Sequence, residues 1–405
     1  MKPIVRAGRM KPVHSDIRGP LFVEAMKRQK QGIDILKLNT GNPATFGFGL
    51  PDSIKNALME HMQDGVGYCD FKGMPQARQA ICDYETSKGI NVITSDDVFI
   101  GNGVSEVVSF ALTPLLNDGD EVLVPSPSYS LWGNSVYLED GKPVFYTCDE
   151  QANWYPDIQD IRSKITDKTK AIVIINPNNP TGVLYPKEIL LEIIQIAREF
   201  GLLIFADEIY DRLVMDGKQH ISLASLTEDV PVITLNGLSK SHCLCGYRCG
   251  WMVISGPREL TEDYRQGIIQ LTSLRLCANT MAQIVIPAAL DDMETPASMV
   301  RPGGRIYEQR EATVRELEKI NGLSFVKNDA AFYVFPKLDV KKFNITNDKQ
   351  FAHDLLDVTN ILLVPGSGFD WKDPDHFRIV MLPQADILSD AIRRMGTFLD
   401  GYKQK

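Results

Sequence analysis

The strongest constraint on the fold of this chain is a pattern that recurs along its middle: a short apolar run, a turn, then helical spacing. The apolar runs cover residues 98–100, 121–124, 171–175, 202–206, 232–235 and 251–254. Runs this short, bounded by Gly, Pro, Asn or Asp, predict buried strands. Residues 187–200 between two of them have the apolar spacing of a helix. Because parallel strands need crossover connections, the alternation predicts an α/β fold with a mostly parallel central sheet between helices.

The chain changes character after about residue 300. A long helical pattern runs to about residue 320, strand-like pieces follow at 331–335, 361–364 and 376–381, and a helical pattern from 386 closes the chain. We therefore predict a large domain followed by a smaller α/β domain. The predicted division is an N-terminal segment (1–45) that belongs to the small domain and covers the active site, a large cofactor-binding domain (46–295), and a small C-terminal domain (296–405).

Composition excludes several classes of partner. The 43 Lys and Arg residues are outnumbered by 52 Asp and Glu, so the net charge is −9, and duplex binding requires a clustered basic surface. We therefore expect no nucleic-acid partner. The apolar runs fall far short of the about 20 residues that span a membrane, and residues 1–20 lack the apolar core of a signal peptide. With an odd number of cysteines, seven, the expectation is a cytoplasmic protein with reduced thiols and no membrane association.

Polar residues follow five of the six predicted strands. In an open α/β sheet, ligands bind beyond the carboxyl ends of the strands, so these turns should meet at one edge. Each turn alone has an ordinary structural explanation as a tight turn, a helix cap or a surface lysine. Their occurrence in order in one chain favours a site. The turns are residues 101–106, 125–129, 176–182, 207–210 and 236–240.

The combined motifs resemble those of a known family. Asn-Pro-Thr-Gly at 179–182, Asp-x-x-Tyr at 207–210, and Ser-Lys at 239–240 with Arg248 eight residues after the lysine are typical of the fold-type I, pyridoxal-phosphate-dependent class I/II aminotransferases. The resemblance covers essentially the whole chain and extends to Gly41-Asn42-Pro43 and 377–379. Within the family the chain is most similar to the bacterial glutamate–pyruvate (alanine) transaminases, through stretches such as DIRGP, GNPATFGFGLP and PGGRIYEQR.

The resemblance implies roles around the cofactor ring. Lys240 would form an aldimine with pyridoxal 5′-phosphate, because a primary amine condenses reversibly with an aldehyde, and would then move the proton between Cα and C4′. Asp207 would pair with the pyridine nitrogen and keep it protonated. Asn179 and Tyr210 would donate to the phenolate oxygen, and Tyr129 would stack on the ring.

It also implies how the phosphate is held. The residues assigned to it within the chain share amides, hydroxyls or a guanidinium, and they are Gly103, Val104, Ser105, Ser239 and Arg248. Tyr68 would reach the phosphate of the neighbouring subunit, so the resemblance implies a homodimer with shared active sites.

For the substrate, Arg378 would bind the α-carboxylate bidentately, with Gly41 and Asn179 beside it. The implied reaction is a ping-pong transamination of amino acids and 2-oxo acids, L-alanine with 2-oxoglutarate giving pyruvate and L-glutamate. Because glutamate carries a second carboxylate, we take Arg18 as the candidate for a mobile second clamp.

Other functions are also consistent with the sequence. An aspartate or aromatic transaminase, or a C–S β-lyase, would use the same scaffold. An aminotransferase-like transcription regulator would need a helix-turn-helix module before the shared part, and only 40 residues precede Gly41. Cys243, Cys245 and Cys249 lack the second Cys-x-x-Cys pair of a zinc site, so we expect no metal.

Overall fold

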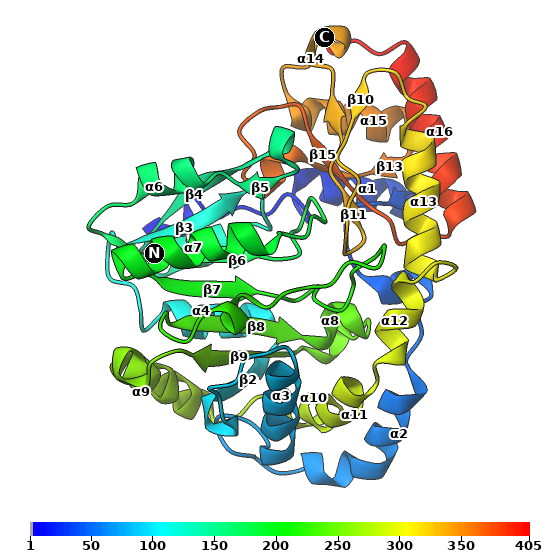
Figure 1. Ribbon diagram of the computed structural model, residues 1–405. Helices are drawn as coiled ribbons and strands as arrows, with labels where there is room; N and C mark the ends of the chain where they lie inside the picture. The colour runs from blue at the N-terminus through cyan, green and yellow to red at the C-terminus, as the bar shows by residue number, and fades with distance from the viewer. Residues whose placement is uncertain (1–2) are drawn as a thin grey trace.

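An eight-stranded sheet forms the centre of the large domain in the computed structural model, which describes residues 3–405 (Figure 1). Its strand order is β2-β9-β8-β7-β6-β3-β4-β5. The strands are β2 (Val98–Asn102), β3 (Glu121–Ser126), β4 (Lys142–Asp149), β5 (Tyr155–Pro156), β6 (Thr169–Ile175), β7 (Leu203–Asp207), β8 (Val232–Gly237) and β9 (Cys249–Ser255).

Strand direction brings the functional turns to one edge. Strands β4, β3, β6, β7 and β8 pair in parallel, while β9 is antiparallel to both β8 and β2. Two antiparallel pairings in succession make β2 run in the same direction as β8. The carboxyl ends of β2, β3, β6, β7 and β8 therefore share an edge with the start of β9.

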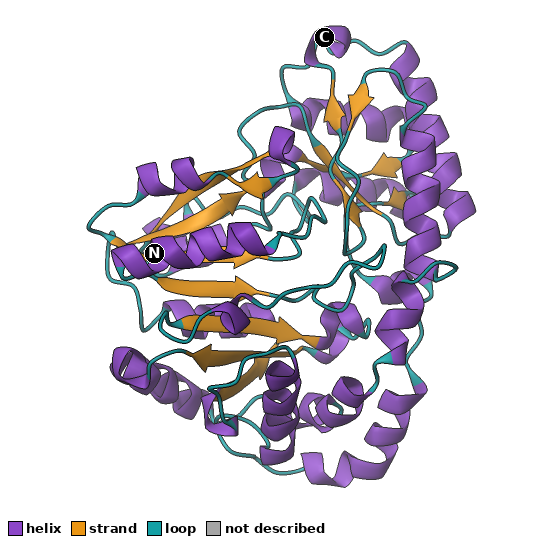
Figure 2. Cartoon of the chain, viewed as in Figure 1, coloured by secondary structure: helices purple, strands orange, loops and turns teal. Residues whose placement is uncertain are grey.

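Helices cover both faces of this sheet (Figure 2). One face packs on α3 (Pro75–Ser87), α6 (Ile158–Lys164) and α7 (Lys187–Phe200), and the other on α4 (Val104–Leu112), α5 (Leu131–Leu138) and α9 (Arg258–Arg275). Successive side chains of a strand point to opposite faces. In β6, Ile172 and Ile174 join the α3/α7 core, whereas Val173 and Ile175 join the α4/α5 core. Burial on both faces explains why the strands read as continuous apolar runs.

The small domain contains short strands packed on helices. Its sheets are β11 (Tyr333–Val334), β15 (Phe377–Val380) and β14 (Val364–Pro365) in that order, and β10 (Leu323–Ser324) with β12 (Lys337–Leu338). A third pair joins β1 (Leu36–Lys37) to β13 (Ile361–Leu362). Because β1 is near the start of the chain, the N-terminal segment contributes to the core of this domain. The residue boundaries of that division stay a prediction.

Further helices connect the two domains or flank them. In the small domain these are α1 (Pro20–Lys30), α13 (Arg305–Leu317), α14 (Val340–Phe343), α15 (Asp348–Thr359) and α16 (Ala385–Asp400). The others are α2 (Asp52–His61), α8 (Leu238–Ser241), α10 (Thr280–Ile284), α11 (Ile286–Asp291) and α12 (Glu294–Val300).

The six predicted strands and the helix at 187–200 are confirmed, as is the predicted fold class. Strand β4 was not predicted from the sequence. Its side chains alternate between buried and partly exposed because it lies near the sheet edge, next to the two-residue β5. The resulting sequence, KPVFYTCD, has a short apolar run, Val144 to Tyr146, followed by the polar Thr147 and Asp149.

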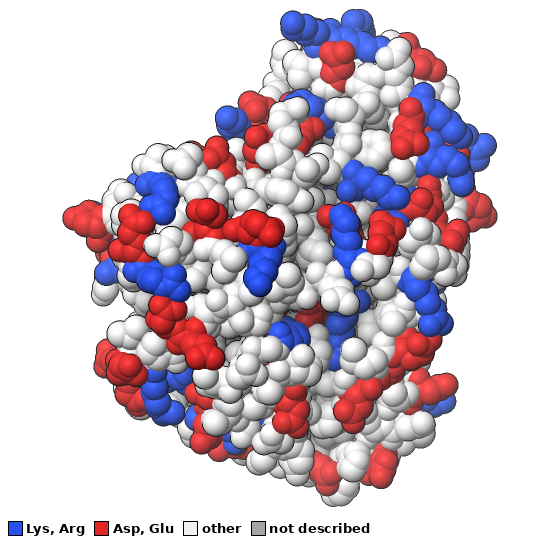
Figure 3. Space-filling view, viewed as in Figure 1, with Lys and Arg blue, Asp and Glu red and all other residues white. Residues whose placement is uncertain are grey.

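The surface carries charges of both signs. Figure 3 shows acidic and basic side chains interspersed over the visible face, without a broad basic area. Among residues 3–405, no single helix is both long and apolar enough to cross a bilayer. Only α9 taken together with Thr280–Asp291 meets that length and composition, as a pair bent by 118°.

Candidate active site

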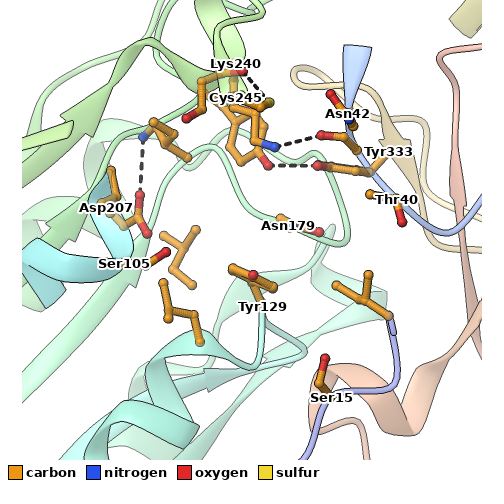
Figure 4. A pocket seen from close by; sticks show the side chains of 18 of the residues that line it. Ser15, Thr40, Asn42, Ser105, Tyr129, Asn179, Asp207, Lys240, Cys245 and Tyr333 are labelled. Carbon is orange, nitrogen blue, oxygen red and sulfur yellow. Dashed lines mark hydrogen bonds between the residues drawn. The ribbon is translucent and has the colours of Figure 1, made fainter. Parts of the chain in front are cut away.

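A cavity of about 740 Å³ opens at the carboxyl edge of the central sheet, and residues of both domains line it (Figure 4). It brings together most of the side chains that the sequence singled out. Those that line it are Arg18, Gly41, Val104, Ser105, Tyr129, Asn179, Asp207, Tyr210, Ser239, Lys240, Arg248 and Arg378. Gly103 lies directly before α4, against Arg248. Tyr68 does not line the cavity of its own chain and is 84% exposed.

Lys240 enters the cavity from α8, the short helix that follows β8. Its Nζ donates to the carbonyl oxygen of Gly41, 2.9 Å away, and lies 5.8 Å from the centre of the Phe332 ring. Burial lowers the pKa of Lys240, but the nearby Tyr333, Cys245 and Tyr129 raise it on balance. Gly41 is required here because a Cβ at this position would overlap the Tyr333 hydroxyl.

Asp207 ends strand β7 and is only 6% exposed. Trp132 Nε1 donates to its Oδ2 at 3.1 Å, and the Ile209 amide donates to its Oδ1 at 3.3 Å. Burial raises the pKa of Asp207 to about 6, against the lowering effect of the Trp132 hydrogen bond. A buried carboxylate with two neutral donors would be stabilised by a cation placed beside it.

Arg378, on β15 of the small domain, is 1% exposed. Its Nη1 donates to Asn179 Oδ1 at 3.0 Å and its Nη2 to the Asn39 carbonyl, while its guanidinium lies 4.7 Å from the ring centres of Tyr333 and Phe369. Its Nε has no hydrogen-bond partner among the described residues. Burial lowers the pKa of Arg378. The surroundings are thus amide, carbonyl and aromatic groups, which leave the positive charge available to a bound carboxylate.

Tyr210 projects from the turn after β7 toward the same side of the cavity. Its hydroxyl lies 2.9 Å from that of Tyr333. With Asn179 bonded to Arg378, the groups predicted for the cofactor ring and those predicted for the substrate form one connected set. Figure 4 shows Tyr333, Asn179 and Lys240 around the same space.

An anion cradle forms where β2 leads into α4. The first amides of a helix have no partner within it and carry partial positive charge. Gly103 adopts a φ of +83°, and a Cβ there would overlap the Arg248 guanidinium. A Cβ at Gly250 would likewise overlap the Val104 amide. Glycines at 103 and 250 therefore let the start of α4 and the start of β9, with Arg248, approach each other closely.

The remaining predicted residues lie at the rim. Tyr129 is 38% exposed and follows β3. Arg18 is exposed and lines both the main cavity and an adjoining one of about 450 Å³. It therefore lies between the two cavities.

Two residues of the site, Trp132 and Tyr333, were not predicted from the sequence. Trp132 bonds Asp207 across 75 residues, and nothing in its local pattern distinguishes it from a core tryptophan. Tyr333 belongs to the strand-like piece at 331–335 but received no role. In the structure this piece contains β11, which pairs with β15, the strand that carries Arg378, and the sequence holds no signal of that pairing.

Asp207→Asn gives a test of the buried carboxylate in the cofactor-free protein. A carboxyl group whose pKa rises to about 6 on folding destabilises the native state as pH increases from about 4 to 6. Relative to wild type, the variant should therefore gain unfolding free energy over this range, by at most about 3 kcal/mol, and the difference should level off above it. Urea unfolding at several pH values measures this. A difference independent of pH would contradict the raised pKa.

Comparisons with known proteins agree with this arrangement. The family described as "Aminotransferase class I and II" matches residues 33–392. The chain is 49% identical to the glutamate-pyruvate aminotransferase AlaA of Haemophilus influenzae, over the full length of both, and 45% identical to an alanine aminotransferase of Mycobacterium bovis, over the whole chain and 94% of that protein.

Solved structures are similar throughout. An aminotransferase from Escherichia coli superposes with a TM-score of 0.98 at 47% identity, with full coverage of both chains. An alanine aminotransferase from Pyrococcus furiosus gives 0.93 at 41% identity, covering 98% of this chain and all of the other. The site geometry, the family match and these full-length relatives agree: the chain belongs to the class I and II aminotransferases.

Proposed function

We propose that this aminotransferase exchanges the amino group between L-alanine and 2-oxoglutarate, giving pyruvate and L-glutamate, with pyridoxal 5′-phosphate as its cofactor. The observation that carries the proposal is the convergence of the Lys240 amine, the buried Asp207 carboxylate and the Arg378 guanidinium on one cavity. Relatives at 45–49% identity, named as glutamate-pyruvate or alanine aminotransferases, support the choice of substrates.

The residues present fit the cofactor. The α4 amides and Arg248, which the glycines at 103 and 250 allow to approach each other closely, would form a cradle for its phosphate. The Asp207 carboxylate, with its raised pKa, suits a protonated ring nitrogen. Lys240 would hold the aldehyde carbon through its amine. When bound, the cofactor supplies an electron-withdrawing ring and a temporary carrier for the amino group.

The chain's own side chains would then position the substrate and the cofactor and hold or move the protons of the reaction. Arg378 would bind the α-carboxylate through its guanidinium, because its surroundings leave its charge uncompensated. Lys240, released by the incoming amine, would move the proton at the substrate Cα. Asp207 would hold the proton on the ring nitrogen, while Trp132 and the Ile209 amide fix the orientation of the carboxylate.

A half-reaction on the purified protein tests the proposal. L-Alanine, L-glutamate, L-aspartate and L-phenylalanine are added separately while the visible absorbance band of the bound cofactor is followed and the oxo acid is identified. We expect rapid loss of the band with alanine and glutamate, which yield pyruvate and 2-oxoglutarate. Lys240→Ala should slow the exchange by at least about a thousandfold, because both the covalent anchor and the proton carrier are lost.

Three other outcomes of the half-reaction experiment would each change the proposal in a different way. A response to aspartate or phenylalanine alone would keep the transaminase and discard the alanine assignment. Pyruvate and ammonia from a β-substituted amino acid would indicate a lyase. A colourless protein that takes up no cofactor would overturn the proposal.

Arg18 should discriminate between the two substrate pairs. It lines the cavity mouth and can meet the second carboxylate of glutamate or 2-oxoglutarate, which alanine lacks. In Arg18→Ala, kcat/KM for glutamate should fall about 10- to 100-fold, the size of a lost charged hydrogen bond, and that for alanine by less than about threefold. Lys37→Ala is the matched control, since Lys37 lines only the adjoining cavity. Equal losses for glutamate and alanine in Arg18→Ala would refute the second clamp.

A homodimer would bring Tyr68 to a phosphate site. Tyr68, Val66 and Leu274 are 84%, 76% and 82% exposed, and the Thr280 hydroxyl, which donates to the Gly65 carbonyl at 2.7 Å, ties this segment to α10. Apolar exposure of this kind favours burial against a second copy.

We expect a dimer by sedimentation. In Tyr68→Phe, the Kd for pyridoxal 5′-phosphate should rise about tenfold through loss of one hydrogen bond to the phosphate. Tyr402→Phe, which removes a small-domain hydroxyl, serves as the control. A monomer that binds the cofactor normally would contradict the shared site.

A further inference from the structure

The turn after β7 presents alternate side chains to opposite sides. Asp207 faces Trp132, a member of the α4/α5 core, whereas Glu208 and Asp211 point to the other side, toward the end of α3. Asp207 and Tyr210 line the cavity. Each of the two residues of this turn that are predicted to touch the cofactor ring is therefore directly followed in sequence by a buried acidic residue on the opposite side.

A single lysine joins these two acidic residues. Lys88, at the C-terminal end of α3, lies with its Nζ 2.8 Å from Glu208 Oε2 and 3.2 Å from Asp211 Oδ2. It also lies 2.7 Å from Glu85 Oε2. Burial lowers the pKa of Lys88, but the three carboxylates raise it well above its usual value. The ammonium group therefore stays charged and clamps both ends of the turn.

Neutral donors complete the binding of the two carboxylates. Asp211 Oδ2 accepts from the Tyr84 hydroxyl at 2.6 Å and from Asn236 Nδ2 at 2.7 Å. Glu208 Oε1 accepts from the Ser222 hydroxyl at 2.8 Å. Asn236 lies on β8, four residues before Lys240, so the same network also holds the strand that leads to the reactive lysine.

The network does not offer an open metal site. Glu208, Asp211 and His220 have ligand atoms within 4.8 Å of one another, a spacing that a cation could use. The Lys88 ammonium is already bonded to Glu208 and Asp211. Burial lowers the pKa of His220 and favours its neutral form, so this imidazole supplies no positive charge to the carboxylates. The positive charge that these carboxylates require comes from the chain itself.

We propose that Lys88 is a positioning residue: by binding Glu208 and Asp211 behind the 207–211 turn, it fixes Asp207 and Tyr210 in the orientation that binds pyridoxal 5′-phosphate. The inference rests on the proposed function, since it concerns that cofactor. Without the ammonium, two buried carboxylates would repel each other and seek water, and the turn would shift. Asp207 and Tyr210, which belong to the same turn, would move with it.

The experiment measures the Kd for pyridoxal 5′-phosphate by absorbance titration of the full-length protein after the cofactor has been removed. In Lys88→Met, which keeps an unbranched side chain one atom shorter and removes its charge, we expect the Kd to rise at least about tenfold. Lys88→Arg restores the charge and should stay within about threefold of wild type. Glu85→Gln is the matched control. Its side chain bonds Lys88 and Trp251, both outside the turn, so its Kd should also stay within about threefold.

Folding is followed separately by circular dichroism and thermal unfolding of the cofactor-free variants. If Lys88→Met does not fold, Tyr84→Phe combined with Ser222→Ala replaces it. That pair removes one donor from each carboxylate and leaves no buried charge unpaired, and its Kd should rise about three- to tenfold.

The results distinguish a failure of the positioning role of Lys88 from a failure of the proposed function. A lower unfolding temperature with an unchanged Kd would overturn the positioning role and leave Lys88 a structural residue. An equal rise in Kd for Glu85→Gln and Lys88→Met would overturn it too. A wild-type protein that fails to bind pyridoxal 5′-phosphate would instead overturn the proposed function, and this inference with it.

Discussion

The direction of the strands in the central sheet determines where the site residues of the large domain lie. Because β2, β3, β6, β7 and β8 end at the same edge, five turns that are far apart in sequence meet around one cavity. The antiparallel β9 adds Arg248 to that edge, since it begins where the others end. Reversing any one of these strands would send its turn to the far side of the sheet. The side chains of these turns can therefore form one site only because the order and direction of the strands bring the turns together.

Much of this arrangement could be predicted from sequence. Continuous apolar runs predict strands reliably where a sheet is buried on both faces. The turns after these runs carry Gly103, Asn179, Asp207 and Lys240, which a parallel sheet places at one edge. The family resemblance then supplied a role for each side chain. Residues of both domains that were predicted from the turns and the resemblance line the cavity.

Other contacts have no signature in the sequence. Trp132 meets Asp207 across 75 residues, and Arg378 meets Asn179 across 199, so each pairing depends on how whole elements pack. The Lys88 network is hidden for the same reason: an isolated lysine at the end of a helix is usually solvated. Only the packing of α3 against the turn after β7 shows that its ammonium is buried among carboxylates.

The cavity is assembled from two parts of the chain with different tasks. Residues 103–248 of the large domain carry the groups proposed to hold the cofactor, whereas Arg378 and the N-terminal Arg18 are the residues proposed to bind the substrate. If Arg18 binds the second carboxylate as proposed, substitutions around it would change which amino acids are accepted while the lysine, the aspartate and the anion cradle stay in place. A lineage of such enzymes can diversify its metabolic role through one segment of the chain and inherit the reaction unchanged through the other.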